Sequence, residues 1–352
     1  MGSMMAFGVS AGVYETSSAE ACQYQAAHCK AHTVVVDDEG GLPDLKVVVV
    51  YNMNPEDVSA HKEAFRKHGV SLYEYKQFMS LDKDDTHLAE VNERKNTQVA
   101  GNCIKLIYTS GTTGVPKAVM LSRDNLVFSA KTTALTMNGI GPGDRLLSYL
   151  PLSHIAAEFL DFEFVCILGC HTTFARPDAL KGGTLGQSLV AVQPTIVLGV
   201  PHVWEKIAAK LHAIGAESTD LKLMISTWAK GSKFTNPTGG LGYSLANMLV
   251  FSKVRAALGL DHCHLCVTGA APISMETLYL FAGLVIPLLE GQFETSGPAT
   301  LCTTSLGYRK GSVGRKISGS ELRVDSETQE IQFMGRHVFM GYLKKDEKTA
   351  EP

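Results

Sequence analysis

Small polar side chains and a lysine cluster in residues 106–119, LIYTSGTTGVPKAV, directly after an apolar run. The hydroxyl side chains, glycines and lysine of this stretch are Thr109, Ser110, Gly111, Thr112, Thr113, Gly114 and Lys117. Backbone N–H groups in such a loop can turn toward one anion, the hydroxyls add donors, and glycine permits a close approach. The lysine adds a full positive charge. The stretch therefore predicts a loop that binds a polyphosphate.

A Walker A loop and a plain polar turn are the alternatives for this stretch. The Walker A motif needs Gly-Lys-Ser/Thr in succession after a first glycine and four intervening residues. Here Gly111 and Gly114 are three residues apart, and Ala118 follows Lys117 where that motif requires a hydroxyl. A plain turn gives no reason for so many hydroxyls beside two glycines and a lysine. Both alternatives are disfavoured.

The elements before this loop alternate between strand and helix. The β-branched runs TVVVDD (33–38) and LKVVVVYN (45–52) predict strands, and the second is apolar enough to be buried on both faces. One helix is predicted after a Ser17 cap, and another begins at Pro55. Residues 79–99 are polar and charge-rich, which indicates a linker or a surface excursion. The alternation predicts an α/β fold with parallel strands.

The elements after the loop continue this pattern. A strand is predicted at KAVML, followed by a helix from Arg123 to about Met137. Three strands end in small, polar, Gly-containing loops near residues 109, 268 and 290. In open α/β sheets, such loop ends gather into one binding crevice. The apolar run LYLFAGLVIPLL contains Pro287 and is too short to cross a bilayer, so it predicts a helix followed by a buried strand.

The composition is that of a globular protein with a large core: 352 residues, 45% hydrophobic and 19% charged, with a net charge of -3. No basic block is present, so nucleic acid is not expected as a partner. The eight cysteines are scattered in apolar runs, which is typical of reduced thiols in the cytosol. The N-terminus has neither the basic nor the apolar region of a signal peptide. We expect a cytoplasmic protein; peripheral contact with the endoplasmic reticulum or another intracellular membrane stays open.

The stretch YTSGTTGVPKAVMLSRDNL strongly resembles the phosphate loop of AMP-forming acyl-CoA synthetases, luciferases and peptide-synthetase adenylation domains. The stretches LLSYLPLSHIAAEFLD, GVPHVWEKI, TGAAPIS and GRHVFMGYLKKDEKTAE narrow the resemblance to long-chain fatty acid–CoA ligases, and GVYETSSAEACQY looks like their bubblegum-type branch. The resemblance covers essentially the whole chain. It implies layered, parallel-rich sheets flanked by helices, as in the large N-terminal domain of adenylate-forming enzymes.

The resemblance also implies how the chain is divided. Residues 1–352 would be part of an AMP-binding domain: a first α/β portion at 1–100, a nucleotide- and acyl-binding subdomain at 101–305, and a β-rich segment at 306–352 leading to a hinge. The small C-terminal domain with the catalytic lysine is expected to be absent, as are the start of the large domain and the ribose-binding Thr-Gly-Asp motif. The chain then looks like the middle of a ligase.

Enzymes of this family join a carboxylate to ATP, release pyrophosphate, and pass the acyl group to coenzyme A. The resemblance therefore implies a long-chain fatty acid, ATP, Mg²⁺ and coenzyme A as ligands, in lipid metabolism. Two unit charges 4 Å apart repel by about 4 kcal/mol at an effective dielectric constant of about 20. A carboxylate can approach a phosphate only where positive charge and hydrogen-bond donors offset that repulsion. By resemblance, the loop residues Thr109 to Gly114 and Lys117 hold the β- and γ-phosphates.

The remaining roles also come from the resemblance. The adenine wall would consist of Gly269, Ala270 and Ala271 in TGAAP, for which a tight turn after a strand is the alternative. Glu294 would bind magnesium, Thr295 would face the α-phosphate or the acyl carboxylate, and His154 would line the acyl site. The apolar segment 155–168 could line an acyl tunnel, but core packing explains it equally well.

Two other features favour packing over chemistry. Trp204 in VPHVWEKI is interpreted as helix packing. The HCHLC stretch places Cys263 and Cys266 at a spacing found in zinc sites, but no second pair follows at a useful distance. We therefore interpret both cysteines as core thiols.

The chain departs from the family pattern just before Glu294, where it has Glu290-Gly291-Gln292-Phe293. Glu290 stands at the position of a tyrosine that stacks on adenine. Since stacking on an aromatic side chain is worth about 1–3 kcal/mol, its loss predicts about 5- to 150-fold weaker nucleotide binding. Phe293 could supply a different aromatic face. A non-catalytic relative that binds nucleotide or acyl chains, or regulates a full-length ligase, is the second functional hypothesis, and we expect little complete ligase activity from this chain alone.

Overall fold

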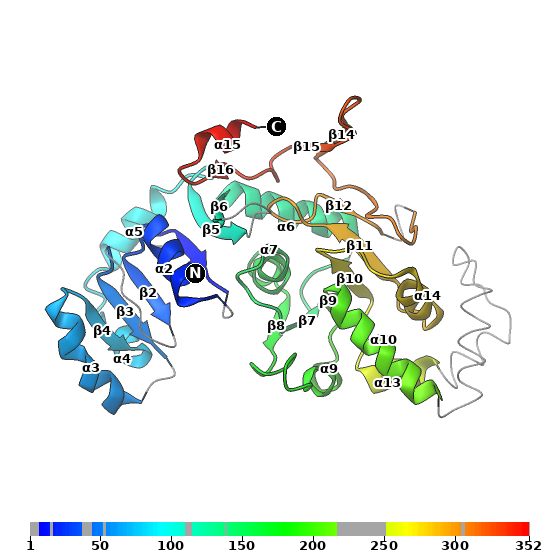
Figure 1. Ribbon diagram of the computed structural model, residues 1–352, viewed down its shortest axis with the longest axis horizontal. Helices are drawn as coiled ribbons and strands as arrows, with labels where there is room; N and C mark the ends of the chain where they lie inside the picture. Colours follow the sequence, from blue (N-terminus) through cyan, green and yellow to red (C-terminus); the bar gives the residue numbers. More distant parts are fainter. Residues whose placement is uncertain are drawn as a thin grey trace. The chain divides into compact units, whose positions relative to one another are not determined.

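The structure is a computed structural model that describes residues 7–14, 17–36, 44–51, 54–109, 115–137, 139–216, 251–303 and 307–351. Its contacts divide the chain into two compact units, which are described separately (Figure 1). Unit 1 comprises Met1–Arg123 with Met340–Pro352, and unit 2 comprises Asp124–Phe339. The first unit thus extends past residue 100 and includes the last residues of the chain.

Unit 1 contains two small sheets and the helices beside them. Its elements are β1 (Ser10–Gly12), α2 (Ala19–His28), β2 (Thr33–Val36), β3 (Val47–Val50), α3 (Pro55–Lys67), β4 (Ser71–Glu74), α4 (Tyr75–Met79), α5 (Leu88–Asn96), β5 (Cys103–Thr109), β6 (Lys117–Ser122), β16 (Gly341–Tyr342) and α15 (Asp346–Ala350). Strands β2, β3 and β4 form a parallel sheet. The other sheet has the order β1-β5-β6-β16, in which β5 and β6 are antiparallel.

Residues 79–99 are mostly exposed, as a surface excursion requires, but the sequence did not indicate helix α5 within them. The apolar signal is weak there because Leu88 is exposed and no residue of α5 is buried. A hydrogen-bonded ion pair between Arg94 and Glu90, one turn apart, supports the helix instead. The first helix is also shifted slightly, because Ser18 rather than Ser17 caps α2 by accepting a hydrogen bond from Ala21 N–H.

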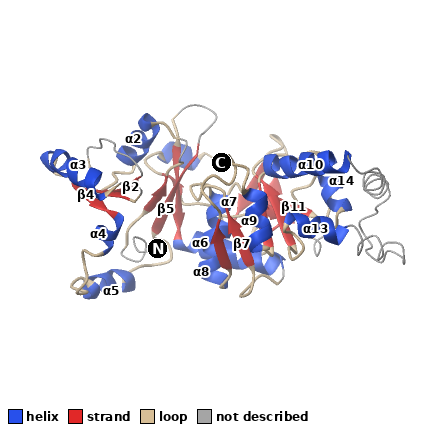
Figure 2. Cartoon of the chain, turned by 90° about the horizontal axis from the view of Figure 1, so that it is seen from below, coloured by secondary structure: helices blue, strands red, loops and turns tan. Residues whose placement is uncertain are grey.

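Unit 2 is built on a long sheet with the order β13-β12-β11-β10-β9-β7-β8. Its elements are α6 (Arg123–Met137), β7 (Arg145–Ser148), α7 (Ile155–Glu158), η1 (Phe159–Glu163), α8 (Phe164–Leu168), β8 (His171–Phe174), α9 (Leu185–Val192), β9 (Ile196–Gly199), α10 (Pro201–Ala216), α13 (Ser252–Leu258), β10 (Leu265–Gly269), α14 (Met275–Gly283), β11 (Leu288–Gln292), β12 (Thr300–Leu301), β13 (Arg315–Lys316), β14 (Glu321–Val324) and β15 (Ile331–Met334). Strands β8, β7, β9, β10 and β11 are parallel, and helices flank them (Figure 2).

Both faces of this sheet are buried in separate hydrophobic cores. On one face, Leu147 contributes to a core with α9, α10 and α14, in which Trp204 and Phe281 are fully buried. On the other face, Leu146 packs with α6, α7, η1 and α8, around Phe159. Neighbouring residues of one strand thus serve opposite cores, as the alternation of side chains along a strand requires. This explains why the strands are continuously apolar.

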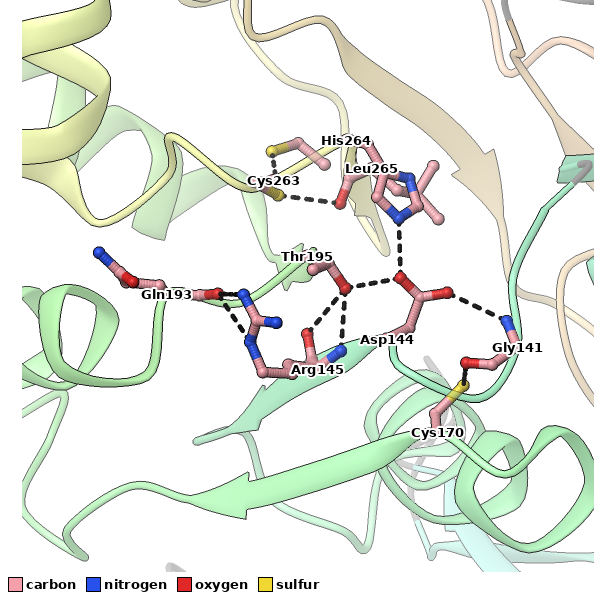
Figure 3. A network of polar contacts seen from close by, with 10 residues as sticks. Gly141, Asp144, Arg145, Cys170, Gln193, Thr195, Cys263, His264 and Leu265 are labelled. Atoms are coloured by element: carbon pink, nitrogen blue, oxygen red, sulfur yellow. Dashed lines mark hydrogen bonds and ion pairs between the residues drawn. The ribbon is translucent and has the colours of Figure 1, made fainter.

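The amino ends of the central strands are joined by a polar network around Asp144 (Figure 3). Thr195 Oγ1 donates to Asp144 Oδ1 at 2.7 Å, and His264 Nε2 lies 2.8 Å from the same oxygen. Gly141 N–H donates to the other carboxylate oxygen at 3.0 Å. Burial raises the pKa of Asp144, but the hydrogen bonds from Thr195, His264 and Gly141 outweigh it and leave the pKa lowered. One carboxylate therefore connects the residues that precede β7, β9 and β10.

The three strands expected to end at one crevice do not share one sheet. Strand β5, which ends at Thr109, belongs to unit 1, whereas β10 and β11 are neighbours in the long sheet of unit 2. Within unit 2, the loops after β10 and β11 follow neighbouring parallel strands, as predicted; one crevice shared with the loop after Thr109 stays a prediction. Across the part of the chain that the structure describes, none of the helices combines the length and the apolar character needed to cross a bilayer.

Candidate functional site

The candidate site in unit 2 lies at the carboxyl ends of the parallel strands. There the chain leaves β7 toward His154, leaves β10 at Gly269, and leaves β11 toward Glu294. Strands β10 and β11 are in register, with Gly269 opposite Gly291. Because parallel strands all point the same way, the residues that follow them meet at one edge of the sheet. The sequence placed these residues in separate loops, and the topology brings them to one edge.

The Gly269-Ala270-Ala271 turn has an unusual backbone. A β-carbon on Gly269 would lie 2.8 Å from Gly291 O and 3.0 Å from the Phe293 ring, so glycine permits the close approach of β10 to β11. Ala270 has a φ of 70°, in the left-handed region that disfavours side chains with a β-carbon. Ala270 and Ala271 are exposed. The turn therefore presents backbone and two methyl groups to solvent, as a flat wall for a planar base requires.

Glu294 is an exposed residue between buried neighbours. Phe293 is 7% exposed and Thr295 is 8% exposed. The hydroxyl of Thr295 donates to Gly297 O at 3.0 Å, so it is engaged within its own loop. The loop is fixed on both sides of Glu294, and its carboxylate faces solvent, where it is accessible to a ligand.

His154 caps helix α7, and the charge of Glu294 influences its pKa. Its Nδ1 accepts a hydrogen bond from Ala156 N–H at 3.2 Å, so the neutral ring carries its proton on Nε2 and can donate from there. Burial lowers the pKa of His154, and the negative charge of Glu294 partly opposes that shift. The structure thus brings together a neutral imidazole donor and a carboxylate, which the sequence separates widely.

Glu290 and Phe293, the departures from the family pattern, both have structural partners. The Glu290 carboxylate accepts a hydrogen bond from Gly311 N–H at 2.7 Å. Burial raises the pKa of Glu290, and the hydrogen bonds from the backbone of Gly311 and Ser312 oppose that shift. The idea that Phe293 offers an aromatic face to a base is wrong, because its ring is packed in the core against Gly269.

The described ends of the phosphate-loop candidate lie in unit 1. Thr109 and Lys117 are opposite each other in the β5–β6 pair, and the Thr109 hydroxyl donates to Lys117 O at 3.5 Å. The Lys117 ammonium lies 4.8 Å from the ring centroid of Tyr342, a contact that nothing in the sequence indicated. The loop residues Ser110, Gly111, Thr112, Thr113 and Gly114 lie outside the described residues.

The packing interpretations of Trp204 and of the two cysteines are confirmed, and an acyl tunnel lined by residues 155–168 stays a prediction. Trp204 is fully buried, and its Nε1–H donates to Gly199 O at 2.9 Å. In the segment 155–168, Phe159 and Phe164 are fully buried core residues. Cys266 is buried, and Cys263 lies at the edge of the core with its Sγ 3.3 Å from Cys266 Sγ.

The candidate site offers one carboxylate, that of Glu294, to a divalent ion. Within the described ranges, no group of three or more His, Cys, Asp or Glu residues could hold a metal by itself. Mg²⁺ commonly binds through one or two carboxylates together with substrate phosphates and water. An exposed Glu294 fits that mode of binding and not a site made by protein alone.

Comparisons with known proteins agree with this geometry. Residues 1–343 match the model of the AMP-binding enzyme family. The chain is 42% identical to a protein described as long-chain-fatty-acid–CoA ligase ACSBG2 from Xenopus laevis and 38% identical to the one from Homo sapiens. It is 37% identical to ACSBG1 from Homo sapiens, which is also described as a long-chain-fatty-acid–CoA ligase. These alignments cover 100% of this chain and 49%, 54% and 50% of the three relatives, so the chain spans about half their length.

Solved structures share the fold. The inhibitor-bound N-terminal domain of FACL13 from Mycobacterium tuberculosis superposes with a TM-score of 0.60 at 17% identity, covering 97% of this chain and 73% of that one. ATP-bound MatB from Rhodopseudomonas palustris gives a TM-score of 0.61 at 20% identity, covering 97% of this chain and 58% of that one. The predicted α/β architecture is confirmed.

Proposed function

The chain belongs to the AMP-binding enzyme family, and from this premise we propose that it forms the nucleotide- and acyl-binding part of an ATP-dependent long-chain fatty acid–CoA ligase. The reaction would couple a long-chain fatty acid to ATP, giving an acyl-adenylate and pyrophosphate, and then transfer the acyl group to coenzyme A. The similarity to long-chain ligases over the whole chain supports the choice of substrate.

The observation that carries the proposal is the position of His154, Gly269 and Glu294 after the carboxyl ends of β7, β10 and β11, parallel strands of one sheet. In the proposed site, the Glu294 carboxylate would hold Mg²⁺ when the nucleotide is bound. The two alanines that follow Gly269 would provide the flat surface for adenine. A contact of Thr295 with the α-phosphate or the acyl carboxylate would require its hydroxyl to turn away from Gly297 O.

The proposed role of His154 is to orient the fatty carboxylate. Because its Nδ1 is occupied by the α7 cap, the Nε2–H remains to donate toward an anion. The burial that lowers the pKa of His154 keeps it neutral near pH 7, so it supplies a directed hydrogen bond and not a full charge. The positive charge that offsets the repulsion between carboxylate and phosphate would come from Mg²⁺ held by Glu294.

The proposed role of the phosphate loop is to hold the β- and γ-phosphates, with Lys117 as its cation. Lys117 rests on the Tyr342 ring, which positions the ammonium at the end of the loop. Long-chain fatty acids partition into membranes, so peripheral contact with an intracellular membrane belongs to the same proposal and is tested by cosedimentation with phospholipid vesicles.

Calorimetric titration of the chain with ATP and Mg²⁺ tests the proposal, followed by ATP–pyrophosphate exchange with fatty acids and shorter carboxylates. Binding is expected to require Mg²⁺, and Glu294→Gln is expected to weaken it by about tenfold, the equivalent of about 1.4 kcal/mol. The matched control is Glu276→Gln, an exposed glutamate in the first turn of α14. An absence of Mg²⁺-dependent ATP binding would contradict the proposal. Binding without exchange would support the non-catalytic relative instead.

A further inference from the structure

The start of helix α6 holds the segment around His337. The side-chain amide of Asn125 donates to Arg336 O at 2.8 Å and to Val338 O at 2.9 Å. A side-chain amide has two N–H donors, and here they reach the carbonyls on either side of His337. Asn125 is 6% exposed, so these hydrogen bonds are shielded from water. The backbone from Arg336 to Val338 is thereby fixed to α6.

The carbonyl of His337, between those two, is held by Ser296. It accepts a hydrogen bond from Ser296 N–H at 3.0 Å and another from the Ser296 hydroxyl at 2.8 Å. The Ser129 hydroxyl lies 2.8 Å from the Ser296 hydroxyl. Because Ser296 has one hydroxyl proton, which its bond to His337 O uses, Ser129 is the donor to Ser296. Both serines are fully buried.

Packing at Gly297 also holds the loop that carries Glu294. A β-carbon on Gly297 would come within 2.8 Å of the Phe159 ring and 3.0 Å of the Ser129 side chain. The backbone at Gly297 therefore lies directly on η1 and α6. Ser296 and Gly297 immediately follow Glu294 and Thr295, so the exposed carboxylate stands on backbone that is fixed by three other segments of unit 2.

We propose that Ser296 and Asn125 are positioning residues for Glu294, an inference that rests on the proposed function of that carboxylate as the magnesium ligand. They act through the carbonyls of residues 336–338, and neither touches the substrate in this role. A displacement of about 1 Å in a reacting group can cost on the order of 100-fold in rate. A loop held by hydrogen bonds from α6 and from the segment around His337 restricts such displacements.

The test compares Ser296→Ala with Ser320→Ala. Ser320 is 2% exposed and donates its hydroxyl to Ile317 O at 2.8 Å, so it matches Ser296 in burial and in the type of bond lost. Ser296→Ala is expected to lose more thermal stability than Ser320→Ala, because it also removes the acceptor of the Ser129 hydroxyl. Only Ser296→Ala is expected to weaken the Mg²⁺-dependent binding of ATP to the chain, by about tenfold. Equal ATP affinities of the two variants would overturn the proposal.

A second measurement does not depend on activity. Hydrogen–deuterium exchange of residues 293–299 is expected to accelerate in Ser296→Ala and in Asn125→Asp, and to stay unchanged in Ser320→Ala. Asn125→Asp disturbs the segment because it places a carboxylate against two carbonyl oxygens. The effects of Ser296→Ala and Asn125→Asp should not add, because both act on the same segment. If the wild-type chain neither binds ATP nor exchanges pyrophosphate, the proposed function fails. The hydrogen–deuterium exchange data still decide whether Ser296 and Asn125 fix the loop. Unchanged exchange in both variants would overturn the positioning role.

Discussion

The carboxylate of Glu290 accepts a hydrogen bond of 2.7 Å from the backbone N–H of Gly311, from a loop that follows β12. Gly311 has a φ of 72°, so this loop needs a residue without a β-carbon at the point where Glu290 holds it. The residue expected to weaken nucleotide binding thus stabilises a neighbouring loop. The departure from the family pattern has a structural function of its own.

Glu290→Tyr is therefore expected to change affinity and stability in opposite directions. An aromatic ring at this position is expected to strengthen ATP binding by about 5- to 150-fold. The loss of an acceptor for the exposed Gly311 N–H is expected to lower the free energy of unfolding by about 0.5–1 kcal/mol. Calorimetric titration and urea unfolding measure the two effects. Glu290→Gln keeps an acceptor oxygen and serves as the control; an affinity gain in that variant would contradict the stacking explanation.

Gly269→Ala is expected to lower the free energy of unfolding by about 1–3 kcal/mol, because its β-carbon would overlap Gly291 O and the Phe293 ring. Nucleotide binding should weaken as well, since the turn after β10 would shift. The matched control is Gly186→Ala in α9, where a β-carbon meets nothing within 4 Å. There, replacing glycine inside a helix should stabilise the protein by about 0.5–1 kcal/mol. Equal effects at the two glycines in chemical denaturation would refute the steric account.

The buried carboxyl group of Asp161 is expected to make the protein less stable as the pH rises. Burial raises its pKa to about 7, opposed only in part by a hydrogen bond from Ser148. The unfolded chain releases this proton near pH 4, so the free energy of unfolding falls between about pH 4 and pH 7. Asp161→Asn removes the charge and should be more stable than the wild type by about 2–4 kcal/mol at pH 8, and nearly equal to it at pH 4. Thermal unfolding between pH 4 and pH 8 measures the stability difference between Asp161→Asn and the wild type. The control for the loss of one charge is Asp84→Asn, at an exposed residue. A stability difference that does not change with pH would exclude the titration of Asp161 as its cause.

His264→Ala should weaken the amino edge of the long sheet by about 1 kcal/mol at pH 7, or less, since His264 is half exposed. The control is His262→Ala. The His262 ring pairs with Asp261 at the surface, so its removal should lower the free energy of unfolding by less than about 0.5 kcal/mol. The lowered pKa of Asp144 means that the network stabilises the protein above about pH 4 and loses its effect as the pH falls and Asp144 is protonated. Urea unfolding at neutral and acidic pH would show whether the effect of His264→Ala shrinks on acidification, and an effect that persists in acid would contradict the network.

The elements of the fold were largely predictable from local patterns. Proline at the first position of α3 and the valine run of β3 specify their own conformations, and both elements form as expected. Helix α5 was missed because its side chains are mostly exposed, so no apolar face marks it. Its support comes from an ion pair, which hydrophobic periodicity does not detect.

The candidate site was predictable in its residues but not in its partners. His154, Gly269 and Glu294 were identified from motifs, and the parallel topology brings them to one edge. The contacts of Glu290 with Gly311 and of Lys117 with Tyr342 join residues that lie far apart in the sequence. Such contacts depend on how loops return to the sheet, and no local pattern encodes that path.

Leu146 and Leu147, adjacent in β7, point into two different interiors of unit 2. Inserting or deleting a single residue in this strand would exchange their sides and disrupt both interiors at once. Point substitutions, by contrast, would disturb one interior and leave the other intact. The structure of unit 2 therefore tolerates replacement of a side chain in β7 far better than a change in the length of this strand.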